Sequence, residues 1–255
     1  MKRLLLVSAA LLMIVAVASC SAANAQSSSS KKAAPALAWN WNGFYVGGHV
    51  GGVWPHLNIT DVGSGGSSFA SAGTAGQIFH ANNKTVLGGG QVGWDHQSKS
   101  LVYGAEGAFG YMNLNGTTLD PGTGSNTMAG MNAGMYENIT GRLGKAFGPA
   151  LLYGKGGVAL FQGNRAFSTT SPSVTSVTNT SVFYGYVAGG GVEYHLQSNW
   201  FARVEYLHSG YASQTFNVLT ISGGPWPFKE QLSGDTVSVG FNYKFHCKSP
   251  AKTKH

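Results

Sequence analysis

The segment D-T-V-S-V-G-F-N-Y-K-F at Asp235–Phe245 alternates large apolar residues with small or polar ones. Successive side chains of a β-strand point to opposite faces, so this alternation gives the strand two different faces. One face would carry Val237, Val239, Phe241, Tyr243 and Phe245, and the other Ser238, Gly240, Asn242 and Lys244. A strand of this kind is typical of a wall with lipid on one side and a polar interior on the other.

Seven earlier segments repeat the pattern, and the connections between segments are alternately long and short. Every proline lies outside the eight segments, which favours strands because proline cannot donate a ladder hydrogen bond. The sequence therefore predicts an all-β fold, an eight-stranded antiparallel transmembrane up-and-down β-barrel with short periplasmic turns and long extracellular loops. The predicted strands are Gly43–Trp54, Thr85–His96, Leu101–Asn113, Tyr136–Ala146, Leu151–Asn164, Ser181–Leu196, Trp200–Tyr211 and Gly234–Phe245. The predicted long loops span 55–84, 114–135, 165–180 and 212–233.

The composition suits a barrel better than a water-soluble domain. Charged residues make up 10% of the chain, against roughly 25% in soluble globular domains. After residue 18 no apolar run approaches the roughly 20 residues of a spanning helix. The formal charge of +7 is confined to the two ends, because residues 33–247 hold nine basic and nine acidic side chains. No basic face is available for nucleic acid. The 38 glycines leave a secreted, soluble glycine-rich protein as an alternative.

The ends of the chain predict export and processing. Residues 1–25 have a basic start, an apolar stretch and a small-x-small site at Ala23–Ala25, as a signal peptide does. A lipoprotein-like box ending at Cys20 is the alternative, and it would leave an acylated cysteine at the mature N-terminus. We expect residues 26–38 to be a disordered periplasmic segment, 39–245 the barrel and 246–255 a basic disordered tail. Trp39 and Trp41 are expected at the membrane–water interface.

The polar faces of the predicted strands predict a charged interior. An arginine or lysine on the lipid face near mid-membrane would cost roughly 2–4 kcal/mol, so the face with charges must be the lumen. Buried charges survive only when they are paired and hydrogen-bonded, and eight strands enclose too little space for a wide channel. We therefore expect a packed polar core, with a narrow ion or proton path as the alternative. The predicted interior cluster is His49, Gln91, Glu106, Arg142, Lys155, Glu193, Arg203 and Glu205.

Catalytic motifs are absent from the sequence. It holds neither a G-x-S-x-G elbow nor an H-E-x-x-H pair. His56, His80 and His208 near the outer end, with Asp61 and Asp120, could form a site only if the loops assembled them. We therefore expect no enzyme, no cofactor and no metal.

Several stretches resemble the small porin-like, opacity-type outer-membrane proteins. W-N-W-N-G-F-Y-V-G-G-H-V-G-G (Trp39–Gly52) is similar to their opening strand. G-R-L-G-K-A-F-G-P-A-L-L-Y-G-K-G-G-V-A (Gly141–Ala159) is similar to their fourth and fifth strands. The last three strands are matched by Gly185–Tyr194, Trp200–Tyr211 and Asp235–Phe245. The resemblance implies an eight-stranded barrel in the bacterial outer membrane, described as a surface antigen, an envelope-stabilising protein or a porin. It carries no catalytic residues.

The resemblance also implies an insertion signal, for which Phe241, Tyr243 and Phe245 are the candidates. Such barrels usually finish on the terminal aromatic residue, whereas ten residues follow Phe245 here. We expect a structural and surface protein of the outer membrane, with a low-conductance porin-like channel as the alternative. The expected partners are outer-membrane lipid and lipopolysaccharide, the outer-membrane assembly machinery and an extracellular ligand of the loops.

Overall fold

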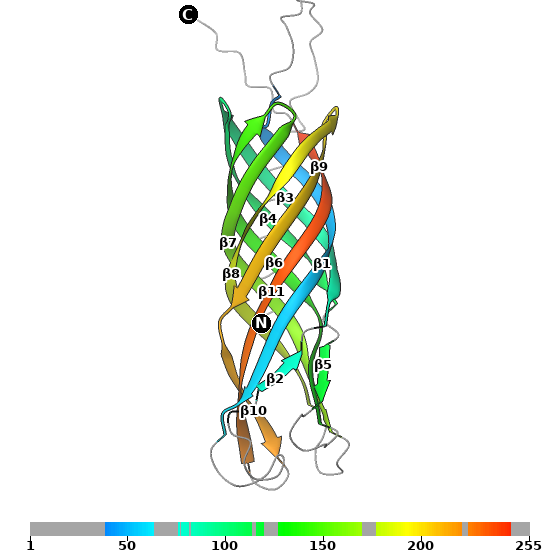
Figure 1. The fold of residues 1–255 in the computed structure, drawn as a ribbon, viewed down its shortest axis with the longest axis vertical. Coiled ribbons are helices and arrows are strands. Elements are labelled where there is room, and N and C mark those ends of the chain that lie inside the picture. Colours follow the sequence, from blue (N-terminus) through cyan, green and yellow to red (C-terminus); the bar gives the residue numbers. More distant parts are fainter. Residues whose placement is uncertain are drawn as a thin grey trace, which may run out of the picture.

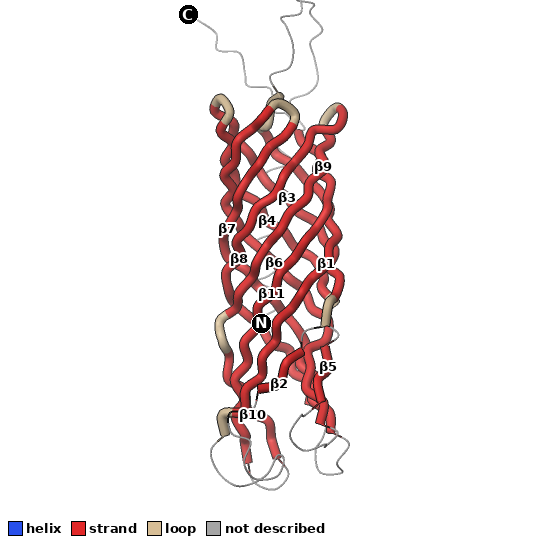
Figure 2. Tube along the Cα trace, in the orientation of Figure 1, coloured by secondary structure: helices blue, strands red, loops and turns tan. Residues whose placement is uncertain are grey.

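The computed structural model describes residues 39–63, 76, 78–81, 83–113, 116–119, 127–169, 177–220 and 224–245. The predicted signal peptide, the segment 26–38 and the tail 246–255 lie outside these residues. The described residues form strands, turns and irregular connections (Figure 2). No helix in this part of the chain is long and apolar enough to cross a membrane.

Eight long antiparallel strands, each tilted relative to the barrel axis, close into a cylinder (Figure 1). Each pairs with its neighbours in the ring, and the last strand pairs with the first over Phe44–Asp61 and Phe228–Phe245. This closure leaves no open edge in the part of the wall next to the short turns, so the backbone there satisfies its own hydrogen bonds in lipid. We call this part the lower wall, because its end is expected to face the periplasm, although Figure 1 draws it at the top. The ring strands are β1 (Gly43–Asp61), β3 (Thr85–Ser98), β4 (Leu101–Met112), β6 (Thr127–Phe147), β7 (Ala150–Thr169), β8 (Val177–Gln197), β9 (Trp200–Tyr211) and β11 (Gly224–Phe245).

The strands of the barrel confirm the predicted fold, but five of them extend into the predicted long loops. β1, β6, β7, β8 and β11 continue for several residues into stretches expected to be loops. Three short strands, β2 (Ile78–Ala81), β5 (Gly116–Leu119) and β10 (Gln214–Thr220), pair with these extensions. All three lie at the lower end of Figure 1. The predicted bounds of the four long loops were therefore too wide. The extensions escaped prediction because their outward side chains no longer face lipid and lose their apolar alternation.

Pro55 shows how an extension accommodates proline. It lies in β1, two residues beyond Val53, which is the last β1 residue paired to β3. On the other side Pro55 still pairs with Gly234 of β11. A proline is tolerated there because one side of the strand is no longer hydrogen-bonded.

Tight turns join the strands at the opposite end of the cylinder, the end expected in the periplasm. β3 and β4, β6 and β7, and β8 and β9 are each connected by two residues. Lys99, Gly148 and Ser198 have φ values of 57°, 61° and 54° in these turns. Two-residue hairpins need such positive φ values so that the turn matches the twist of the strands.

The outer wall carries an apolar belt. Its large side chains are exposed on the single chain, as lipid-facing residues must be, and they alternate with buried lumen residues. Aromatic residues mark both borders of the belt, among them Trp200 at the end of the tight turns and Trp54 ten residues up β1 from Phe44. Ten strand residues at about 3.3 Å each, tilted by roughly 45°, cover about 25 Å of membrane thickness.

Candidate functional site

The lumen is filled in layers, and the lowest layer closes the end of the tight turns. Trp41, Val102, Leu151, Tyr153 and Phe201 form a buried apolar cluster there. The Nζ of Lys244 lies 4.8 Å from the Trp41 ring and donates to the Trp41 carbonyl oxygen. The expectation that Trp41 lies at the membrane–water interface was therefore wrong. Trp41 precedes the first strand, and its side chain points into the lumen. There it buries its apolar ring against the other members of this cluster and closes the end of the barrel.

Above this layer, eight charged side chains form one buried network. Four acids, Asp95, Glu106, Glu193 and Glu205, are balanced by four bases, Arg142, Lys155, Arg203 and Lys244. Each of the eight is less than 8% exposed. Since buried charges are stable only when paired, the equal numbers make the network self-sufficient.

Glu106 is the centre of the network. Its Oε1 is 2.7 Å from Lys155 Nζ, and its Oε2 is 2.7 Å from Arg203 Nη1. The hydroxyl of Tyr45 donates to the same Oε2 at 2.7 Å. These three partners come from β7, β9 and β1, so a single β4 carboxylate ties together strands from around the cylinder.

The other ion pairs extend the network across the lumen. Arg142 Nη2 donates to Glu193 at 2.9 Å, and its Nε lies 3.2 Å from Asp95. Lys244 Nζ is 2.6 Å from the other Asp95 oxygen, which links the network to the apolar layer below. The pairs connect non-adjacent strands, so they cross the lumen.

Neutral polar groups continue the network upward. Asn242 donates to Glu193 at 2.7 Å and accepts from Gln91 at 2.7 Å. The Oε1 of Gln91 is 2.5 Å from Nδ1 of His49, and Nε2 of His49 is hydrogen-bonded to the Tyr136 hydroxyl. The two carboxamides and the imidazole thus connect the ionic layer to a small cavity.

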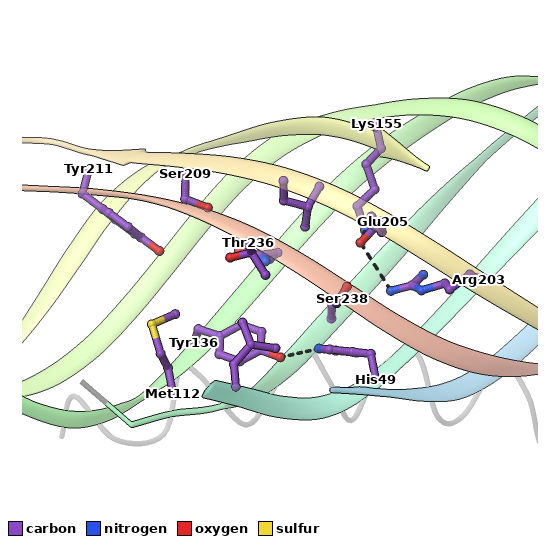
Figure 3. A pocket seen from close by; sticks show the side chains of 14 residues that line it. His49, Met112, Tyr136, Lys155, Arg203, Glu205, Ser209, Tyr211, Thr236 and Ser238 are labelled. Carbon is purple, nitrogen blue, oxygen red and sulfur yellow. Dashed lines mark hydrogen bonds and ion pairs between the residues drawn. The ribbon is translucent and has the colours of Figure 1, made fainter. Parts of the chain in front are cut away.

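This cavity, of about 30 Å³, lies beside His49 (Figure 3). Tyr136 and His49 meet on one side, while Arg203 and Glu205 meet on another. A space of this size holds one or two water molecules.

The lumen above the cavity is lined mainly by apolar side chains, although Glu230 is also buried there. The side chains that fill it include Val53, Leu57, Ile59, Leu87, Phe161, Phe183, Phe228 and Leu232, all of them buried. Four of these, Leu57, Ile59, Phe228 and Leu232, come from the strand extensions that the sequence analysis expected to be loops. The interior therefore consists of an ionic layer between two apolar layers.

The structure places all eight residues of the predicted interior cluster on the lumen side, with Gln91, Glu106, Arg142, Lys155, Glu193, Arg203 and Glu205 buried and His49 partly buried. Glu106, Arg142, Lys155, Glu193, Arg203 and Glu205 make direct ion pairs, and Gln91 with His49 is joined to them through Asn242. The prediction omitted Asp95 and Lys244, although strand alternation already put both on the polar face. It also omitted Tyr45 and Tyr153, whose inward positions share the parity of His49 and Lys155.

The histidines considered for catalysis lie on the outer wall. His56 and His208 flank Asp235, whereas His80 of β2 contacts Asn58. The side chain of Asp61 and all of Asp120 lie outside the described residues. Among the residues that the structure describes, no group of three or more histidine, cysteine, aspartate or glutamate side chains could hold a metal ion.

The closed ring, the apolar belt and the ion-paired lumen define an integral β-barrel of the outer-membrane type. The chain belongs to the outer membrane protein beta-barrel domain family, whose sequence model matches residues 10–245. It is 27% identical over 208 residues to a 22 kDa outer membrane protein of Rhizobium leguminosarum bv. viciae, covering 82% of this chain and 80% of that protein.

Two further similarities agree with the family. A 31 kDa outer-membrane immunogenic protein of Brucella melitensis is 27% identical over 222 residues, which cover 84% of this chain and 87% of that protein. The outer membrane protein OprG from Pseudomonas aeruginosa has the same fold, with a TM-score of 0.53 at 13% identity, covering 80% of this chain and 96% of OprG. The protein is therefore located in the cell outer membrane.

The candidate insertion signal occupies the last five residues of β11, Phe241–Phe245. Phe241 is exposed toward lipid, and Tyr243 stacks edge-on against both Trp200 and Phe245. Phe245 still pairs with Phe44 of β1, so it is the last residue of the closed ring. A role of these aromatic residues in recognition by the assembly machinery stays a prediction.

Proposed function

We propose that this protein is a structural and surface protein of the outer membrane, and that its lumen does not conduct. The observation that carries the proposal is the ionic layer, in which four buried acids and four buried bases bind one another across the lumen. An ion that passed through would have to break these pairs and cross the apolar layers above and below them. The barrel would then contribute to envelope integrity by its stability and to surface interactions by its loops.

The relatives support a surface role. The name of the Brucella protein describes it as immunogenic, which requires contact with the host's immune system. We extend this property to the present chain as part of the proposal. The extracellular loops would carry such interactions because they are the parts of a barrel that leave the membrane. An enzymatic activity is not part of the proposal, since the resemblance brings no catalytic residues.

Planar-bilayer recording of the purified barrel tests the proposal. We expect no discrete conductance steps at moderate salt and voltage. Steps that disappear when Arg203→Ala is introduced would contradict it and would favour the low-conductance channel. A barrel with known conductance, inserted by the same procedure, provides the positive control. An unboiled gel sample of each preparation verifies that the tested protein is folded.

A further inference from the structure

Four polar side chains meet on the outside of the barrel, where the apolar belt ends. Asp235 of β11 accepts a hydrogen bond from Tyr206 at 2.6 Å, and Nδ1 of His208 lies 2.9 Å from the same oxygen. Nε2 of His56 is 3.8 Å from the other oxygen. The cluster joins β1, β11 and β9, and none of its members is part of the lumen network.

The height of this cluster follows from the strand register. Asp235 lies ten residues from Phe245 along β11 and pairs with Trp54 on β1 and with His208 on β9. That distance corresponds to about 25 Å of membrane thickness, so the cluster lies at the outer border of the apolar belt. A lipid headgroup of the outer leaflet must occupy the space beside it.

The cluster is open toward that headgroup. The side chains of His56 and His208 are 53% and 39% exposed, and that of Asp235 is 30% exposed. The ring of Tyr186 on β8 lies 6.0 Å from the ring of His208. Trp54, which lies two residues before His56 in β1 and on the same face, is also exposed. Aromatic rings of this kind prefer the headgroup region, where they fix the depth of the barrel.

The cluster combines two imidazoles with one carboxylate. Histidine is the side chain whose charge changes between pH 5 and 8, whereas aspartate is ionised throughout that range. The titratable groups that face one another are Asp235 on β11, His56 on β1, Tyr206 and His208 on β9 and Tyr186 on β8. With both imidazoles neutral the cluster carries one negative charge, and with both protonated it carries one positive charge. Protonation of both imidazoles would therefore convert the cluster from repelling to attracting an anion.

We propose that His56, His208, Asp235 and Tyr206 form a protonation-dependent binding site for a phosphate group of the lipopolysaccharide headgroup. Tyr206 donates to Asp235, and Asp235 orients the His208 ring through Nδ1. This leaves Nε2 on the opposite side of the imidazole to donate to phosphate when protonated. The site would hold the outer-leaflet glycolipid more tightly as the surroundings become acidic.

Binding of diphosphoryl lipid A to the folded full-length barrel in detergent micelles tests the site at pH 7.5 and pH 5.5. Each charge near an anionic lipid surface contributes on the order of 1 kcal/mol, and every 1.4 kcal/mol is tenfold in affinity. We therefore expect an increase of roughly tenfold at the lower pH. The pair of changes His56→Gln and His208→Gln should abolish the increase. His96→Gln should keep it, because His96 stacks on Trp94 and Tyr103 at the opposite border of the belt.

A second variant is expected to bind lipid A more tightly, whereas a variant that fails to fold would bind it less tightly. Asp235→Asn removes the negative charge and should strengthen binding at pH 7.5. Equal affinity of the wild type at the two pH values, or an equal increase in the double variant, would overturn the proposal. The same increase with dephosphorylated lipid A would exclude phosphate as the ligand. Competition by millimolar inorganic phosphate as effective as that by lipid A would exclude the lipid as the occupant.

Discussion

At the scale of single residues, the lumen depends on a few positions that admit no other side chain. Gly93 of β3 faces the lumen beside Tyr45, and a Cβ on Gly93 would overlap the buried Tyr45 ring. That ring is needed where it is, because its hydroxyl donates to Glu106 and accepts from Arg142. The glycine thus makes room for the aromatic residue that completes the ionic layer.

Gly93→Ala should destabilise the folded barrel by about 1–3 kcal/mol, the usual cost of overpacking a filled interior. The measurement is urea-induced unfolding in lipid vesicles, followed by tryptophan fluorescence. Gly88→Ala is the control on the same strand, since a Cβ there would meet only the His49 carbonyl oxygen at 3.8 Å. Equal losses for the two variants would show that strand propensity, and not the space for Tyr45, determines the effect.

Glu106→Gln should cost more, about 3–5 kcal/mol, because it leaves Lys155 and Arg203 without their shared carboxylate. The same unfolding experiment measures the loss. Adding Lys155→Gln to Glu106→Gln restores the charge balance, so the double variant should lose less than the sum of the two single losses. Additive losses would mean that the lumen charges act independently.

At the scale of elements, strand alternation predicted the lower wall and missed the upper one. The segment Asp235–Phe245 has one face for lipid and one for the lumen, so its period is visible in the sequence. In the upper part of β11 the outward residues Lys229 and Gln231 are polar, while Phe228 and Leu232 face inward and are buried. The outer surface of this part of the strand faces water instead of lipid, so its outward residues are polar. In the sequence, such polar residues next to glycine and proline cannot be distinguished from a loop.

The interior could also be predicted only in part from the sequence. Parity placed charges in the lumen but could not say which pairs form, because pairing depends on the stagger of strands that are distant in sequence. Trp41 lies before the first strand, where no periodicity exists to indicate its direction. Asp235 and His208 lie in two predicted strands, but only the register of β9 and β11 shows that they are opposite each other.

The extension of β11 can be mapped by cysteine labelling in a Cys247→Ser background. Gln231→Cys should react with a water-soluble maleimide in intact vesicles, because this exposed position lies above the apolar belt. Val239→Cys should react only after detergent treatment, since it is 50% exposed on the single chain but faces acyl chains in the membrane. Rapid labelling of Val239→Cys in vesicles would contradict the assigned belt.

The lower end of β11 leads to a different prediction. Phe245 is the last described residue that pairs with β1, and it closes the ring against Phe44. A stop codon after Phe245 should leave membrane insertion intact, measured as the unchanged mobility difference between unboiled and boiled samples. Loss of that difference would assign the tail a part in assembly.

At the scale of the whole molecule, the lumen is filled by several packed layers that follow one another along the barrel axis. The apolar layer around Trp41, the ionic layer around Glu106 and the apolar layer around Phe161 follow one another in the lumen. Each layer is built from several strands, so the strands are tied together from inside as well as through the wall. This arrangement is consistent with the structural role that we propose.

The stacking of layers leads to a prediction about redundancy. Because an ion must cross all the layers in series, opening one layer should not open the pore. Trp41→Ala removes the largest side chain from the mouth, yet the ion pairs of Glu106 and the packing around Phe161 remain intact. Bilayer recordings of this variant should stay as silent as those of the wild type. Stable conductance steps in Trp41→Ala alone would show that the mouth layer is the only seal, and that the charged layer above it already contains a path for ions.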